Sequence, residues 1–451
     1  MKSVSLIIFA CFVGYTDAFT FGSFNKQHTK QTQVLHAIEE ATTISSSSWE
    51  ELSDTLTKRT EQSTPPKPPK VTLYRDTNGW CPFCERVWLI LRAKNIQYDE
   101  QLISLQNKPD WYKALVPTTL VPAVLFHEDA DKKNERRIVW ESSDIIEALD
   151  EAFPEHPMLR DTPEYDIAVQ MNDDLTKAGF EFVYAGRNDT LTDEDKLERK
   201  AKFISELDRL DAALVEQQLK VDGDTCFRLG EEFTAVDAIM IPTLERWRYQ
   251  LPLTADIDIL EGRKGLKKWF ASMDSYEPYS GRVMGDEYSW VATNSMFLRY
   301  FGGGEDKPDV AAAIKRADDA AERLTSSFLD QAIFEDDCKK HSMEAAAKLV
   351  SNHDAIVKDC TRGDPSSQQH IERASSEDDA DMMLRHVCML LLSETDTLKE
   401  ATESLLPEIT KDGAAAAKVV ASRLCVPRDM SAPAASILRA TLSSIANRIE
   451  E

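Results

Sequence analysis

The chain has 451 residues, of which 42% are hydrophobic and 29% charged, as is usual for folded domains and unlike disordered or collagen-like chains. Its 53 lysines and arginines face 78 aspartates and glutamates, so the formal net charge is −25. This acidic balance argues against binding nucleic acid and against a polybasic attachment to membranes, because both need a basic face. At about 150 residues per domain, the length predicts roughly three domains.

Eight cysteines are too few for a fold that is built on disulfides. Only Cys81 and Cys84 are closely spaced along the chain. A structural zinc site needs four ligands, usually two such pairs or a pair with histidines, so we expect no metal.

The first residues have the pattern of a secretory signal peptide, which we assign to residues 1–18. Lys2 is followed by an apolar run from Val4 to Val13 and then by the small residue Ala18. The run is too short to span a bilayer, and its alternative interpretation is a buried N-terminal strand. Because no later stretch is long and apolar enough to span a membrane, we expect the mature protein to be soluble.

Residues 19–69 are interpreted as a transit and linker segment. The segment opens with Phe19 and carries no acidic residue before Glu39, an arrangement that resembles the two-part leader of plastid proteins in algae with secondary plastids. A plastid location is therefore predicted, and secretion or the endomembrane lumen is the alternative. Four prolines between 65 and 69 favour an extended, stiff spacer, after which a new domain begins.

Residues 70–154 are predicted to form a domain that carries the cysteine pair. Val71–Tyr74 is a short apolar strand, 86–94 has a helical period, and 98–105 returns as a strand. The sequence Cys81-Pro82-Phe83-Cys84 stands at the turn into the helix. The cysteines therefore occupy the start of the helix in a strand–helix–strand unit.

That position favours nucleophilic chemistry. A cysteine at a helix N-terminus faces free N–H groups and the positive end of the helix dipole, and both stabilise the thiolate. Cys81 is the expected nucleophile, and Cys84, one turn further on the same helix face, is a candidate resolving thiol. The alternative interpretations of the cysteine pair are that its spacing arises by chance and that it is one half of a metal site.

Two further features follow in the chain. Pro122 opens an apolar strand at 120–126, where a cis bond would leave the backbone of Val121 open to a peptide ligand. After a charged hairpin loop and a strand at 138–140, Glu141 and Ser142 open another helix. Ser142 is expected to cap this helix, and the free N–H groups at the helix start suit a bound carboxylate. The alternative is that Glu141 and Ser142 only cap the helix and bind no ligand.

These features together resemble the N-terminal thioredoxin-like domain of the glutathione transferases, and most nearly the cysteine-type omega and lambda classes. The residues that carry the resemblance are Cys81-Pro82-Phe83 with Glu85-Arg86, then 105–111, then Leu120-Val121-Pro122, then Glu141-Ser142. The resemblance implies that Cys81 attacks or holds the glutathione sulfur and that Lys108 contacts the glycine carboxylate. It also implies roles for the backbone at Val121-Pro122, beside the cysteinyl part, and for Glu141 and Ser142, at the γ-glutamyl end.

Cys84 departs from the omega and lambda pattern, in which alanine is common at this position. Whether the protein uses one thiol or two therefore stays open.

Residues 155–304 are predicted to form the all-helical domain of the same family. Thr234 and Asp237 form a variant of the capping box before a mostly apolar helix at 238–247, which we expect to be the buried central helix. A second substrate is expected between the two domains, although most aromatic residues in such helices are simply core. The candidates for the walls of this second-substrate pocket are Trp80, Tyr184, Trp247 and Tyr249.

Residues 305–451 lie beyond the resemblance and have helical patterning. No motif there carries chemistry, because the four cysteines and the histidines form no cluster. The segment is interpreted as a packing or oligomerisation appendage.

The predicted fold is therefore an α/β thioredoxin-like domain, an all-α domain and an extra helical region. The predicted function is a glutathione-dependent thiol transferase or reductase, with dehydroascorbate-reductase-like activity, in which Cys81 forms a mixed disulfide. Conventional conjugation, which needs a Tyr or Ser donor, and a non-enzymatic ligand-binding or regulatory role are the alternatives. The expected partners are glutathione as co-substrate and a small-molecule or glutathionylated substrate, with a homodimer as the candidate assembly.

Overall fold

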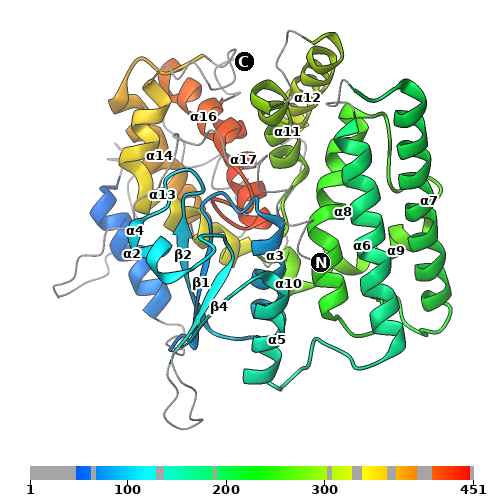
Figure 1. The fold of residues 1–451 in the computed structure, drawn as a ribbon. Helices are drawn as coiled ribbons and strands as arrows, with labels where there is room; N and C mark the ends of the chain where they lie inside the picture. Colours follow the sequence, from blue (N-terminus) through cyan, green and yellow to red (C-terminus); the bar gives the residue numbers. More distant parts are fainter. Residues whose placement is uncertain are drawn as a thin grey trace. The chain divides into compact units, whose positions relative to one another are not determined.

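The computed structural model describes residues 47–61, 68–127, 137–185, 190–301, 307–327, 338–362, 372–393 and 409–446 (Figure 1). They fall into two compact units. The first unit holds the described residues from 68 to 323 together with Val426–Ala432, and the second holds the remaining ones. The predicted signal peptide at 1–18, and the following residues to 46, lie outside the described residues.

The first unit begins with a four-stranded sheet of order β2-β1-β3-β4, built from β1 (Val71–Asp76), β2 (Tyr98–Ile103), β3 (Ala123–Phe126) and β4 (Arg137–Trp140). β1 pairs in parallel with β2 and antiparallel with β3, which pairs antiparallel with β4. The parallel pair requires a crossover, which α3 (Pro82–Ala93) supplies. The predicted strand–helix–strand unit and the thioredoxin-like sheet are thus confirmed.

Successive β1 side chains point to opposite faces of the sheet, as the period of two requires. Val71 and Leu73 join the main core with residues of α3 and of α5 (Ser142–Ala152). Tyr74 lies in a second core with Tyr112 of α4 (Asp110–Leu115) and with both cysteines of the pair. The nucleophile candidate therefore belongs to the sheet face that α4 covers.

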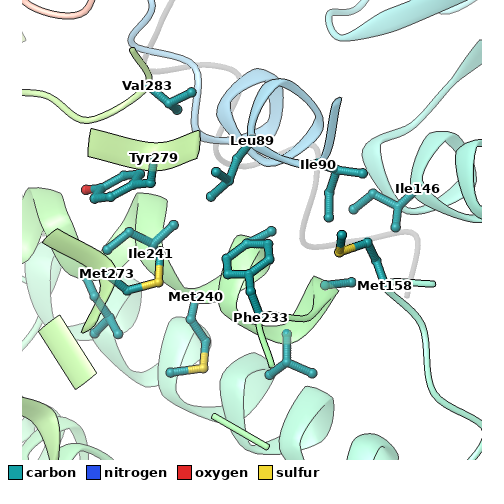
Figure 2. Close-up of a cluster of buried hydrophobic side chains, with 14 of the residues drawn as sticks. Leu89, Ile90, Ile146, Met158, Phe233, Met240, Ile241, Met273, Tyr279 and Val283 are labelled. Carbon is teal, nitrogen blue, oxygen red and sulfur yellow. The ribbon is translucent and has the colours of Figure 1, made fainter. Parts of the chain in front are cut away.

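The helical part follows in the same unit. Its helices are α6 (Pro163–Val183), α7 (Asp193–Gln218), α8 (Ala235–Thr254), α9 (Lys264–Asp274), α10 (Glu277–Ser280), α11 (Glu287–Phe301) and α12 (Pro308–Ser327). α8 is buried along most of its length and packs against α3, α6 and α11, so the predicted central helix is confirmed. Figure 2 shows side chains of α3 and α5, such as Leu89 and Ile146, meeting Phe233, Met240 and Ile241 of the helical part in one cluster. The two domains thus share a core.

Asp237 organises the start of α8. Its Oδ2 accepts hydrogen bonds from the backbone N–H and the hydroxyl of Thr234, at 3.0 and 3.1 Å. Its Oδ1 accepts from the backbone N–H of Arg228 at 2.7 Å and from Nε1 of Trp269 at 2.8 Å. The carboxylate, which is fully buried, therefore reaches back as the sequence predicts and also binds α9.

A short segment of the C-terminal region belongs to the first unit. The backbone N–H of Val426 donates to Oγ of Ser289 at 2.8 Å, and Nη1 of Arg282 donates to the carbonyl of Pro427. A Cβ added at Gly79, whose φ is +68°, would lie 3.1 Å from Cγ of Pro427. The region beyond 305 is thus not wholly separate from the transferase-like part of the chain.

The second unit is helical: α2 (Trp49–Glu61), α13 (Cys338–Thr361), α14 (Glu377–Leu391), α16 (Lys411–Arg423) and α17 (Ala432–Ala446). α2 packs against α13 and α14, with Nε1 of Trp49 donating to Asp381 at 2.7 Å. The segment 19–69, interpreted as a transit and linker segment, therefore contains a helix. α2 contains only three apolar residues, Trp49, Leu52 and Leu56, which are too few for the sequence to indicate a packed helix.

Among the helices in the described ranges, none carries an apolar stretch that is long enough to cross a bilayer.

Candidate active site

Three segments meet at one end of the sheet. In the strand register, Tyr74 of β1 is opposite Ala123 of β3, which is opposite Trp140 of β4. The chain continues past Tyr74 towards Cys81, enters β3 through Val121-Pro122, and leaves β4 into Glu141. The residues predicted from three distant stretches of sequence are therefore brought to the same edge.

Cys81 is the N-cap residue of α3, directly before Pro82 at the first helical position. Its backbone is extended, and its side chain makes no capping hydrogen bond. The thiol is thus placed at the positive end of the helix, where a thiolate is favoured. With 6% of its surface exposed, Cys81 is also largely shielded from water.

Cys84 lies one turn into α3 and is 1% exposed. Burial raises the pKa of its thiol well above the ordinary value, and a hydrogen bond with Cys81 raises that pKa further. Cys84 is therefore held as a protonated thiol beside Cys81.

Asp76, at the end of β1, is a residue that the sequence analysis missed. It is 1% exposed, and its Oδ2 accepts a hydrogen bond from the backbone N–H of Trp80 at 2.8 Å. A carboxylate oxygen of Asp76 and the sulfurs of Cys81 and Cys84 all lie within 4.8 Å of one another. The only signal in the sequence was an acid at a strand end five residues before the first cysteine, which does not by itself indicate proximity.

Two cations interact electrostatically with Cys81. Lys108, between β2 and α4, is half-buried; burial lowers its pKa, and attraction to Cys81 opposes that effect. Burial also lowers the pKa of Arg86 to about 10, against attraction to Asp173 and Cys81. Lys108 and Arg86 are thus two cations whose charges interact with Cys81.

Val121 and Pro122 are joined by a cis peptide bond and are both buried. Val121 precedes Ala123, the first residue of β3 that pairs within the sheet. The cis bond that would leave the backbone of Val121 open to a peptide ligand is therefore present, and Val121 packs in the same cluster as Cys81.

Glu141, rather than Ser142, is the N-cap of α5, so the prediction that Ser142 caps this helix is wrong. Ser142 is already the first helical residue, and the side chain of Glu141 makes no capping hydrogen bond. Glu141 has a φ of 68°, which costs a residue with a side chain about 1–3 kcal/mol. Strain of this kind is common at binding sites, and here it presents an exposed carboxylate at the edge of the sheet.

The four aromatic candidates for a second-substrate pocket are in different environments. Trp247 is 4% exposed and packs edge-on against Phe180 and Phe203, while a Cβ at Gly179 would come within 2.1 Å of its ring. These contacts make Trp247 a core residue, as most aromatic residues in such helices are. Trp247 is therefore not a wall of a second-substrate pocket.

The other three aromatic candidates also have partners. Trp80 is 8% exposed with its ring edge-on to Phe297, Tyr184 stacks on Phe180, and Tyr249 lies beneath the guanidinium of Arg248.

A buried ionic network connects α8 to the turn before Cys81. Arg246 forms an ion pair with Glu85 at 2.8 Å and donates to the carbonyl of Trp80 at 2.9 Å. Next to it, Oε1 of Glu245 accepts hydrogen bonds from the hydroxyl of Tyr279 at 2.6 Å and from the backbone N–H of Gly285 at 2.9 Å. Burial, with the charge of Glu85, raises the pKa of Glu245 to about 8.

We expect Glu245→Gln to remove a pH dependence of stability. Folded Glu245 has a pKa of about 8 against an ordinary 4.5, so between these values the native state holds a proton that the unfolded chain releases. Stability from this group is therefore full below about pH 4.5 and is lost as the pH rises through 8. Glutamine mimics the protonated acid, because one oxygen still serves both donors.

The variant should match the parent protein near pH 5 and exceed it near pH 8 by roughly 3–4 kcal/mol in urea unfolding. Glu232→Gln, at an exposed ion pair, is the control. A parallel pH dependence in the parent and the Glu245→Gln variant would contradict the assignment.

The family model "Glutathione S-transferase, N-terminal domain" matches residues 80–152, and "Glutathione S-transferase, C-terminal domain" matches residues 194–272. The chain is 31% identical over 211 residues to glutathione S-transferase L3 of Arabidopsis thaliana, a match covering 46% of this chain and 80% of that protein. This chain belongs to the glutathione S-transferase family.

Other relatives agree. The chain is 31% identical over 203 residues to the chloroplastic glutathione S-transferase L2 of Arabidopsis thaliana, covering 44% of this chain and 62%, less than two thirds, of that relative. It is 26% identical over 242 residues to glutathione S-transferase omega-1 of Rattus norvegicus, covering 52% of this chain and 91% of that protein.

Proposed function

We propose that the protein is a glutathione-dependent thiol transferase or reductase in which Cys81 is the nucleophile. The observation that carries the proposal is the position of Cys81: a shielded thiol at the N-terminus of α3, at the sheet edge where Val121 and Glu141 also lie. The names of its relatives, of the lambda and omega glutathione S-transferases, support glutathione as the co-substrate. Dehydroascorbate-reductase-like activity belongs to the same proposal.

The reaction has two exchanges. The Cys81 thiolate attacks the glutathione sulfur of a mixed disulfide, the old S–S bond breaks, and the substrate leaves as a thiolate that takes a proton from water. The thiolate of a second glutathione then attacks the glutathione sulfur on Cys81. Oxidised glutathione leaves, and the Cys81 thiolate is regenerated.

The site contains groups suited to each end of glutathione. Lys108, a cation that interacts with Cys81, would bind the glycine carboxylate, and Val121, which precedes a cis peptide bond, would pair its backbone with the cysteinyl part. Glu141 provides a carboxylate for the γ-glutamyl ammonium, and the hydroxyl of Ser142 and the free N–H groups of α5 suit the carboxylate.

The test compares two reactions on the full chain. A glutathionylated small disulfide should be turned over with glutathione, whereas an aromatic electrophile should be conjugated far more slowly. A cysteine at the position of the usual donor forms a mixed disulfide instead of leaving the glutathione thiolate free. Faster conjugation than disulfide reduction would reject thiol transfer in favour of conjugation.

We expect Glu141→Ala to weaken glutathione binding and to leave the thiol unaffected. A charge-assisted hydrogen bond is worth about 1.5–3 kcal/mol, so the affinity measured by calorimetry should fall roughly ten- to a hundredfold. The pH dependence of Cys81 alkylation without glutathione should not change, because α3 and not α5 activates that cysteine.

Asp144→Ala, which removes an exposed acid from the first turn of the same helix, is the matched control. An unchanged affinity in Glu141→Ala would rule out the binding role. A large change in the alkylation profile would mean that Glu141 acts on the thiol.

We also propose that residues 1–18 act as a signal peptide and that a transit segment after Phe19 directs the protein to a plastid. The chloroplastic relative supports this location. Because α2 packs within the second unit, the targeting information should lie before Trp49. A fluorescent protein fused to residues 1–48 should enter plastids, and a cytosolic signal would reject the leader.

A further inference from the structure

The most unusual group near Cys81 is the carboxylate of Asp76. In the described part of the chain, its Oδ1 is one of few buried side-chain oxygens without a hydrogen-bond partner. Leaving such an atom unpaired in the protein interior is costly, so its retention calls for an explanation. Asp76 brings an oxygen within 4.8 Å of both sulfurs.

The surroundings of Asp76 hold its carboxylate in place. Its Oδ2 is held by the backbone N–H of Trp80, so the carboxylate cannot turn without releasing the loop that ends at Cys81. The backbone N–H of Asp76 lowers the pKa of Cys84 and the charge of the Asp76 carboxylate raises it, both against the larger effect of burial. Asp76 therefore acts on Cys84 through its main chain and brings one carboxylate oxygen close to both sulfurs.

We propose that Asp76 is a catalytic residue that accepts the proton of Cys84, whose thiolate then attacks Cys81 after Cys81 has taken up glutathione. This inference rests on the proposed function, which supplies the mixed disulfide on Cys81. Under this proposal the protein uses both thiols, because Cys84 forms the disulfide that releases glutathione from Cys81.

The step balances as follows. The S–H bond of Cys84 breaks and its proton moves to Oδ1 of Asp76. The Cys84 thiolate forms a bond to the sulfur of Cys81, the bond from Cys81 to glutathione breaks, and glutathione leaves as a thiolate that takes up a proton. Two glutathione molecules then reduce the Cys81–Cys84 disulfide, giving back both thiols and one oxidised glutathione.

The interaction between the two cysteines also explains why Cys84 reacts only after the adduct on Cys81 has formed. Besides burial, the charge and hydrogen bond of Cys81 raise the pKa of Cys84. When Cys81 is bonded to glutathione, it no longer carries a thiolate charge, so this contribution to the raised pKa of Cys84 is removed. Proton transfer to Asp76 then becomes easier at the stage at which the Cys84 thiolate is needed.

Single-turnover mass spectrometry with acid quenching tests the step, with the full chain mixed with one equivalent of a glutathionylated small disulfide. The parent protein should form the adduct and then close the disulfide. Cys84→Ser should keep the adduct. Asp76→Asn, which retains an oxygen for Trp80 but no base, should form the adduct at the parent rate and close about a hundredfold more slowly.

Two controls accompany this comparison. Glu100→Gln, which alters a carboxylate on the neighbouring strand β2, should close like the parent. Long equilibration with oxidised glutathione should bring the Asp76→Asn variant to the same extent of disulfide as the parent, because only the rate depends on the base.

Several results would overturn the inference. Closure of Asp76→Asn at the parent rate would exclude Asp76 as the base, and loss of the disulfide at equilibrium would show a purely structural role. Zinc bound to the purified parent protein, and lost in Asp76→Asn, would make the three atoms a metal site instead. No adduct in Cys84→Ser would reject the proposed function itself, and this step with it.

If Asp76→Asn does not fold, closure in the parent protein is measured in heavy water. Closure should then slow more than adduct formation, since only closure begins with a proton transfer from a thiol. Equal slowing of both steps would overturn the proposal.

Discussion

Replacing Cys81 with serine is expected to abolish thiol transfer, lowering turnover at least about a thousandfold, while Cys84→Ser keeps most of it at millimolar glutathione. Cys81 is the residue at the helix N-terminus, and a serine hydroxyl there can neither ionise at neutral pH nor form a mixed disulfide. Cys84 lies inside α3 as a buried thiol, and external glutathione can release the adduct without it.

The measurement is turnover of a glutathionylated small disulfide by each variant. Cys226→Ser, at a buried cysteine of the helical part, is the control for replacing a thiol in the core. Equal loss in Cys81→Ser and Cys84→Ser would contradict the single essential nucleophile and make the disulfide step obligatory.

Asp237→Asn is expected to destabilise the protein by about 3 kcal/mol, because the buried carboxylate accepts four hydrogen bonds. An asparagine has one acceptor oxygen, so its amide NH₂ must face donors from Thr234 or from Arg228 and Trp269. The same change breaks the start of α8, the helix on which the shared core is built.

Urea unfolding at neutral pH gives this free energy. Asp274→Asn, at an exposed ion pair with Arg248, is the matched control and should change stability by less than about 0.5 kcal/mol. Activity per folded Asp237→Asn molecule should equal that of the parent. A destabilisation no larger than that of the control would contradict the role assigned to Asp237.

The predictable parts of the fold are those with local signals. The strand–helix–strand unit around Cys81 follows from apolar spacing and from a proline at the first helical position. The start of α8 follows from Thr234 and Asp237, which are three residues apart. In both cases the residues that decide the structure are neighbours in the chain.

The unpredictable parts depend on distant partners. The proposed role of Asp76 depends on the two sulfurs that folding brings close to it. The raised pKa of Glu245 depends on its burial near the charge of Glu85. The sequence favours Ser142 as the cap because serine is a good capping residue, but the helix begins one residue earlier, after Glu141, whose positive φ no local preference favours. Helix α2 is stabilised by α13 and α14, which lie almost 300 residues further along the chain.

The most direct measurement for the nucleophile is a mass spectrum of the Cys84→Ser protein after incubation with oxidised glutathione, followed by peptide mapping. The account predicts one glutathione, attached to Cys81, and no adduct when Cys81 is also replaced by serine. No adduct on the Cys84→Ser protein, or an adduct on a cysteine other than Cys81, would contradict it.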